Sequence, residues 1–162
     1  MDTERFAKDI QTPPSPYLRG KGLGGGGKYY IILSALTEFK RIDIAISAFN
    51  TLQIPLLIIG EGNKRSELES ISHKNIHFAG AQYGDELVSL VQESLGLIFP
   101  GEEDFGIVPI EVMAAGKPVF ALGKGGLRET VIPGKTGDFF FEADGSDFIE
   151  HFTSFHEKNK SG

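Results

Sequence analysis

The stretch YYIILSALTEFKRIDIAISAFNTLQIPLLIIG, residues 29–60, contains one complete strand–helix–strand unit. Short apolar runs at 29–34 and 55–60 are typical of strands that are buried on both faces. The segment between them carries one apolar stripe at helical spacing, formed by Ile42, Ala45, Ile46 and Phe49. Two buried strands joined by an amphipathic helix indicate a parallel pair, so we expect a chain of the α/β class.

The same alternation of apolar runs and helical stripes continues along the rest of the sequence. Further strands are expected at 75–78, 96–100, 117–122 and 137–141. Helices are expected at 41–50, at 63–72, after Asp85 as capping residue, at 107–115 and from 146 to about 156. Right-handed crossovers between parallel strands place helices on both faces. We therefore predict a Rossmann-like, doubly wound parallel sheet of about six strands, with a ligand beyond the carboxyl ends of the strands.

Residues 1–28 differ in composition from the rest of the chain. Pro13, Pro14 and Pro16 are incompatible with a continuous helix, and glycine fills most of the stretch 20–27. We interpret residues 1–28 as an interdomain linker or leader and residues 29–162 as one folded domain.

The composition argues against several classes of protein. A net charge of −6 disfavours a general nucleic-acid-binding or membrane-binding surface. Cysteine is absent, which excludes disulfides and thiolate metal sites, and the four histidines have no convincing ligand partners. The sequence has neither a secretory signal pattern nor an apolar run long enough to span a membrane. We expect a soluble, cytoplasmic protein without a metal site.

The clearest chemistry lies in the segment PGEEDFGIVPIE, residues 100–111. Glycines at 101 and 106 allow a tight turn between a strand and a helix, whose first N–H groups lack partners and carry partial positive charge. A pyrophosphate fits such an end. The acids 102–104 beside it either complement the helix dipole or act on a ligand. Glu111 lies in an otherwise apolar helix, so its carboxylate must be paired or turned toward a ligand, such as two ribose hydroxyls.

The stretch EDFGIVPIEVMAAGKPV, residues 103–119, resembles the E-x(7)-E signature of family 4 glycosyltransferases, with Glu103 and Glu111 as its glutamates. The segments GGLRETV (125–131) and GKTG (134–137) are in register with the same family. Two glutamates at this spacing are common, but the surrounding Phe-Gly, Ala-Ala-Gly-Lys-Pro and Gly-Gly-x-x-Glu elements make the match specific. The resemblance covers about 29–141 and implies the nucleotide-sugar-binding domain of a retaining enzyme, one half of a GT-B architecture.

The resemblance also implies roles for individual residues. The donor-binding positions would be Lys40, Arg41, Phe105, Gly106, Ile107 and Glu111. Among these, Glu111 would hold the ribose hydroxyls, and Lys40 would contact the diphosphate, which agrees with its place after a strand. Glu103 would be the catalytic residue, near the transferred sugar. Its role as nucleophile, stabiliser or positioning group stays open.

Ala35 departs from the family pattern. Relatives commonly carry an arginine here that contacts the diphosphate, whereas this chain reads Ser34-Ala35-Leu36. Losing that contact would weaken donor binding by an amount on the order of a few kcal/mol. Ala35 is thus a phosphate-side position where three explanations stay open: a degenerate site, a substituted one, or compensation by Lys40, Arg41 or Lys124.

The implied function is the donor-binding half of an enzyme that moves a sugar from a nucleoside diphosphate sugar to an acceptor hydroxyl, without a metal or other cofactor. Residues 1–6 resemble the family's interdomain segment, so we expect that this chain lacks the acceptor-binding N-terminal domain, and peripheral membrane contact through that domain stays open. GDP-mannose and UDP-sugars are both compatible donors. The alternative is a non-catalytic nucleotide- or sugar-phosphate-binding module. A dinucleotide-binding oxidoreductase is disfavoured because no G-x-G-x-x-G follows the first strand.

Overall fold

The computed structural model describes residues 29–101 and 107–160, whose strands form one parallel sheet. The strands are β1 (Tyr30–Leu33), β2 (Leu56–Ile59), β3 (Ile76–Gly80), β4 (Leu97–Phe99), β5 (Val119–Leu122) and β6 (Gly137–Phe140). Their order, β3-β2-β1-β4-β5-β6, is that of a doubly wound fold. The predicted fold class is confirmed, with strand ends that differ from the expected ones by one or two residues. The predicted linker, 1–28, lies outside the described residues.

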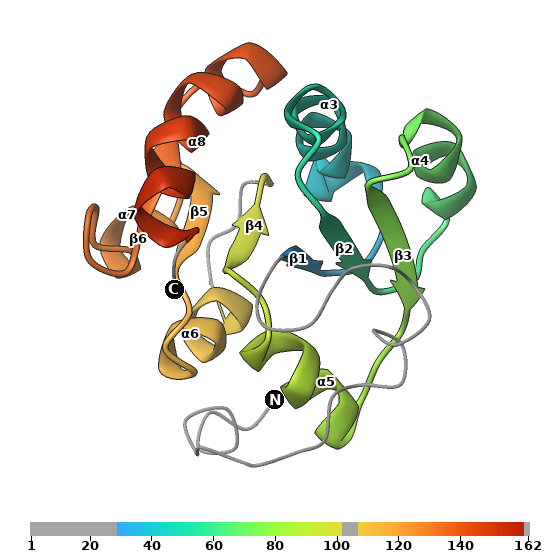
Figure 1. The fold of residues 1–162 in the computed structure, drawn as a ribbon, viewed down its shortest axis with the longest axis horizontal. Helices are drawn as coiled ribbons and strands as arrows, with labels where there is room; N and C mark the ends of the chain where they lie inside the picture. Colours follow the sequence, from blue (N-terminus) through green and yellow to red (C-terminus); the bar gives the residue numbers. More distant parts are fainter. Residues whose placement is uncertain (1–28, 102–106, 161–162) are drawn as a thin grey trace.

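The helices lie in two layers, one on each face of the sheet (Figure 1). One layer consists of α3 (Ile42–Leu52), α4 (Arg65–Ile71) and α8 (Gly145–Asn159). The other consists of α5 (Gly84–Gln92), α6 (Ile107–Ala114) and α7 (Leu127–Thr130). The expected helices are all present. The sequence did not predict α7 or the 3₁₀ turn η1 (Glu38–Lys40), since elements this short carry no apolar stripe.

Two helix starts differ from the prediction. Helix α5 begins at Gly84, so Asp85 lies in its first turn and is not the capping residue. There its charge complements the helix dipole. Helix α8 begins one residue earlier than expected because Asp144 caps it, accepting a hydrogen bond from the backbone N–H of Asp147 at 2.7 Å.

Alternate residues of β1 enter two separate cores. Tyr30 and Ile32 face the layer of α3 and α8, whereas Ile31 faces the layer of α5 and α6. The first core is an aromatic cluster, formed by Tyr30, Phe49, Phe120, Phe140, Phe148, Phe152 and Phe155. The three phenylalanines that α8 contributes are at most 1% exposed. These rings fix α8 against β1, β5 and β6, because close edge-to-face packing leaves little freedom.

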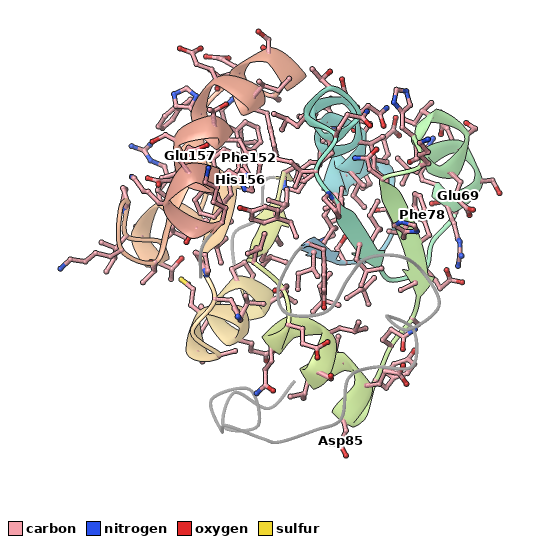
Figure 2. The ribbon with its side chains drawn as sticks, viewed as in Figure 1. Glu69, Phe78, Asp85, Phe152, His156 and Glu157 are labelled. Carbon is pink, nitrogen blue, oxygen red and sulfur yellow. The ribbon has the colours of Figure 1, made fainter. Side chains whose placement is uncertain are left out.

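A hydrogen bond between Tyr30 and His156 joins β1 to α8. The buried Tyr30 hydroxyl lies 2.8 Å from Nδ1 of His156, whose ring stacks on Phe152 (Figure 2). Burial lowers the pKa of His156; Lys160 acts in the same direction and Glu157 in the opposite one. The neutral imidazole can therefore accept the hydrogen bond from the Tyr30 hydroxyl.

We predict that His156 makes the domain less stable in mild acid. Its pKa is lower in the folded than in the unfolded state, so the unfolded chain binds the proton more readily. The stability that neutral His156 contributes is complete above the pKa of the unfolded state, about 6.5. It is lost as the pH falls toward the lower pKa of the folded state. Urea unfolding from about pH 8 to pH 5 should show a smaller loss for His156→Gln than for wild type. The exposed His73→Gln serves as control; equal losses in all three proteins would contradict the prediction.

Candidate functional site

The strand order reverses between β1 and β4, at the centre of the sheet. These strands pair in parallel, but α3 follows β1 on one face and α6 follows β4 on the other. In doubly wound sheets such a reversal opens a crevice for ligands. Here a small hollow is lined by Ile32, Leu33, Ser34, Lys40, Ile98, Phe99, Pro100 and Gly101. The hollow lies where the fold rule predicts a ligand.

The loop after β2 packs directly on the loop after β1. A Cβ at Gly60, whose φ is 140°, would lie 1.8 Å from the carbonyl oxygen of Ser34. A Cβ at Gly62 would lie 2.3 Å from the carbonyl oxygen of Leu36. The backbone N–H of Leu36 also donates to the carbonyl of Glu61 at 3.0 Å. Only glycine permits this approach at 60 and 62. The sequence predicted a strand that ends at residue 60, but it did not predict that Gly60 packs on the backbone of Ser34.

Gly101, at the start of the motif segment 100–111, packs closely on the backbone of Lys40. A Cβ at Gly101 would lie 3.0 Å from the carbonyl oxygen of Lys40 and 3.1 Å from its Cα. Glycine at 101 was expected to permit a turn, and the structure adds close packing on a second loop. The lysine and the start of the glutamate motif, far apart in sequence, therefore lie side by side.

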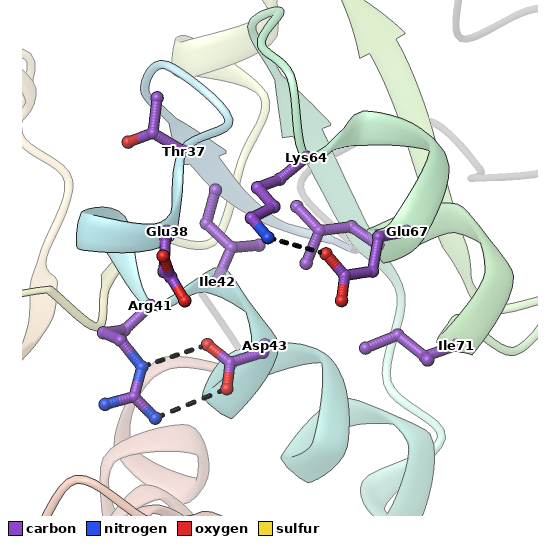
Figure 3. A pocket seen from close by; sticks show the side chains of 9 residues that line it. Thr37, Glu38, Arg41, Ile42, Asp43, Lys64, Glu67 and Ile71 are labelled. Carbon is purple, nitrogen blue, oxygen red and sulfur yellow. Dashed lines mark hydrogen bonds and ion pairs between the residues drawn. The ribbon is translucent and has the colours of Figure 1, made fainter.

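Lys40 and Arg41 line different cavities. Lys40 ends η1 and lines the hollow between β1 and β4. Arg41 lines a separate cavity of about 400 Å³ between α3 and α4, and its guanidinium binds Asp43 there (Figure 3). The structure thus brings together Lys40 and Gly101, whereas the Arg41 side chain pairs with Asp43 of α3.

Glu111 lies one turn inside α6 and is 2% exposed. Its neighbour Val112 belongs to the core under α5 and α7, so this helix is held firmly against β4 and β5. Ile107 is the first residue of α6. Glu103, Phe105 and Gly106 lie outside the described residues. A carboxylate so deeply buried is costly without polar partners, which agrees with the requirement stated from sequence.

Ala35 is exposed at the carboxyl edge, directly after β1. The hydroxyl of the preceding Ser34 donates to the carbonyl oxygen of Ala35 at 3.0 Å. The Ala35 side chain thus has room for a larger group.

One metal-compatible group occurs among residues 29–101 and 107–160, formed by Asp147, Glu150 and His151. The Asp147 carboxylate accepts hydrogen bonds from the backbone N–H groups of Phe141 and Glu142, which lower its pKa. The cluster lies at the start of α8, after β6, and its hydrogen bonds join these two elements.

A doubly wound sheet with a small hollow at its strand-order reversal, lined by Lys40 and Gly101, defines a Rossmann-like domain. More specifically, the chain belongs to the group 1 glycosyl transferases, whose family profile matches residues 18–161. The glycosyltransferase resemblance predicted from the motif is thereby confirmed at the level of the group 1 family, and family 4 and a retaining mechanism stay predictions. The described helices include none with the length and apolar character that crossing a membrane requires.

Curated relatives carry glycosyltransferase names. The α-1,3/1,6-mannosyltransferase ALG2 of Dictyostelium discoideum is 60% identical over 138 residues, covering 68% of this chain and 33% of its own length. The GDP-mannose-dependent α-mannosyltransferase of Mycobacterium tuberculosis is 30% identical over 138 residues, covering 85% and 35%. The chain spans about a third of the length of these relatives.

Solved structures show the same fold. HepE of Anabaena in complex with UDP aligns with a TM-score of 0.81 at 20% identity, covering 99% of this chain and 47% of HepE. The sucrose-phosphate synthase of Thermosynechococcus elongatus aligns with a TM-score of 0.77 at 22% identity, covering 99% and 42%. The chain therefore corresponds in fold to less than half of each of these proteins.

We predict that Gly60→Ala destabilises the domain by about 2–5 kcal/mol, because it combines a strained φ with a clash against Ser34. Gly134→Ala is the matched control, since Gly134 has a φ of 79° but nothing within 4 Å of an added Cβ. The control should lose about 1–2 kcal/mol through its backbone strain alone. Urea unfolding measures both, and equal losses would show that the contact between the loops after β1 and β2 contributes little.

Proposed function

We propose that this chain is the donor-binding part of a retaining family 4 glycosyltransferase, which moves a sugar from a nucleoside diphosphate sugar to an acceptor hydroxyl. The observation that carries the proposal is the close approach of Gly101 to the backbone of Lys40 at the strand-order reversal. Membership of the group 1 family supports a transferase, and the UDP bound to HepE supports a nucleotide in a domain of this fold.

The diphosphate would lie between Lys40 and the N-terminus of α6. The Lys40 ammonium adds a point charge to the partial positive charge of the helix end. The backbone N–H groups of Phe105, Gly106 and Ile107 would face the sugar and phosphates. When the glycosidic bond breaks, negative charge develops on the leaving diphosphate. Fixed donors aimed at that charge lower the barrier, which is why we propose catalysis without a metal. Glu103 would act beside the transferred sugar.

Glu111 would bind the ribose. Its carboxylate lies on the same helix as the phosphate-facing end, one turn further in. Burial removes competing water, so hydrogen bonds from two hydroxyls to this carboxylate would be strong and specific for ribose.

We propose mannose, carried by GDP, as the donor sugar. The ALG2 relative, at 60% identity, is a mannosyltransferase, and the mycobacterial relative is named for GDP-mannose. UDP-sugars are the alternative, since the HepE structure holds UDP. A non-catalytic nucleotide-binding module is the second candidate, and the exposed Ala35 in place of an arginine favours it. The cytoplasmic location and the acceptor-binding partner domain stay predictions from the sequence.

The proposal predicts that Lys40→Ala weakens binding of GDP or UDP roughly tenfold or more, the scale of a hydrogen bond between charged groups. Affinity for the matching nucleoside, guanosine or uridine, should stay unchanged because it lacks phosphates. Lys135→Ala is the control: this lysine is exposed and lines a cavity together with Lys117 and Pro118, which precede β5. Isothermal titration calorimetry measures all three proteins. Failure of wild type to bind any nucleoside diphosphate would reject the donor-binding role.

Ala35→Arg should tighten diphosphate binding, with a gain that shrinks as salt rises. The exposed position lets a guanidinium reach toward the crevice, and salt screens exposed charges. Calorimetric titration at low and high salt, with diphosphate and nucleoside, measures the effect. A gain for the bare nucleoside as well would contradict the placement of Ala35 beside the phosphates.

A further inference from the structure

A single residue in a left-handed conformation connects two helices at the candidate site. Arg41 has φ 49° and ψ 40° and is both the C-cap of η1 and the N-cap of α3. Its N–H donates to the carbonyl of Glu38, and its own carbonyl accepts from the N–H of Ile44. This conformation is unfavourable for residues with a Cβ, so an arginine here needs local support.

Asp43 binds the side chain of this left-handed arginine. Its two carboxylate oxygens accept hydrogen bonds from Nε and Nη2 of Arg41 at 3.2 and 3.4 Å (Figure 3). Both side chains are about half exposed, at 43% and 51%, so the pair adds little to overall stability. A two-point contact nevertheless restricts the rotamers of the Arg41 side chain.

The direction of the Lys40 side chain depends on this turn. Lys40 lines the hollow beside Gly101, and Arg41 lines the cavity beside α4. The two neighbouring residues thus line different cavities, and the left-handed residue lies between η1 and α3. If residue 41 left the left-handed region, Lys40 would no longer be directed at the crevice.

We propose that Asp43 is a positioning residue for Lys40: by holding Arg41 in the left-handed turn, it directs the lysine to the anion crevice between β1 and β4. Arg41 then acts through its backbone conformation, and its guanidinium is the group that Asp43 binds. This inference rests on the proposed function, since it assigns the Lys40 crevice to a diphosphate.

The proposal makes a prediction opposite in sign to simple electrostatics. An acid near an anion site repels the anion, so charge alone predicts that removing Asp43 strengthens diphosphate binding. Positioning predicts the reverse. If only a fraction of the molecules holds Lys40 at the crevice, the measured affinity for the diphosphate is the intrinsic affinity multiplied by that fraction.

The test is a double-mutant cycle in the full chain, measured by calorimetry with GDP, UDP and their nucleosides. Asp43→Ala should weaken diphosphate binding about two- to fivefold, the scale of an exposed ion pair. In the Arg41→Gly background the same change should have almost no effect, because glycine adopts the left-handed turn without support. Nucleoside binding should not respond. Glu69→Gln is the matched control, since Glu69 pairs with Arg65 at 2.8 Å on α4 but supports no left-handed residue.

The outcomes are distinct. Loss of diphosphate affinity that disappears in the Arg41→Gly background supports the proposal. Unchanged or stronger binding by Asp43→Ala overturns it, as does an equal loss in both backgrounds or a parallel loss for the nucleosides. If the wild-type chain binds no diphosphate, the proposed function fails together with this inference. Binding without coupling between positions 41 and 43 overturns the inference alone.

Discussion

Burial of the central sheet on both faces is the constraint on which the rest of this domain depends. Strand β1 directs Tyr30 into one core and Ile31 into the other, so each face needs its own helical layer. Parallel strands can be connected only by crossovers, and the crossovers after β1 and β4 cover opposite faces. The loops that leave these two strands must diverge. The crevice lined by Lys40 and Gly101 lies at that divergence.

Glycines, which have no side chain, determine how the loops pack at this edge of the sheet. Gly60 and Gly62 let the loop after β2 contact the backbone after β1, and Gly101 lets the motif loop contact Lys40. Backbone packed on backbone has few alternative arrangements, because there are no rotamers to change. Backbone contacts outside regular secondary structure therefore join the loops after β1 and β2.

The aromatic cluster connects this edge to the helix α8. Tyr30 begins the strand whose carboxyl end leads to Lys40, and its ring and hydroxyl are held by Phe152 and His156 of α8. Helix α8 therefore helps to fix the position of β1.

The sequence by itself determined the α/β class, nearly all the strands and helices, and the glycosyltransferase family. Apolar periodicity reports local burial, and the run from residue 103 to 119 is specific enough to identify the family. It did not predict α7 or η1, which are too short for a periodic signal, nor the capping of α8 by Asp144. Only the tertiary structure determined which residues from distant parts of the sequence are in contact. The contact of Lys40 with Gly101 follows from strand order, a non-local property of the chain. The left-handed φ of Arg41 is likewise seen only in the structure, because residue propensities disfavour it at an arginine.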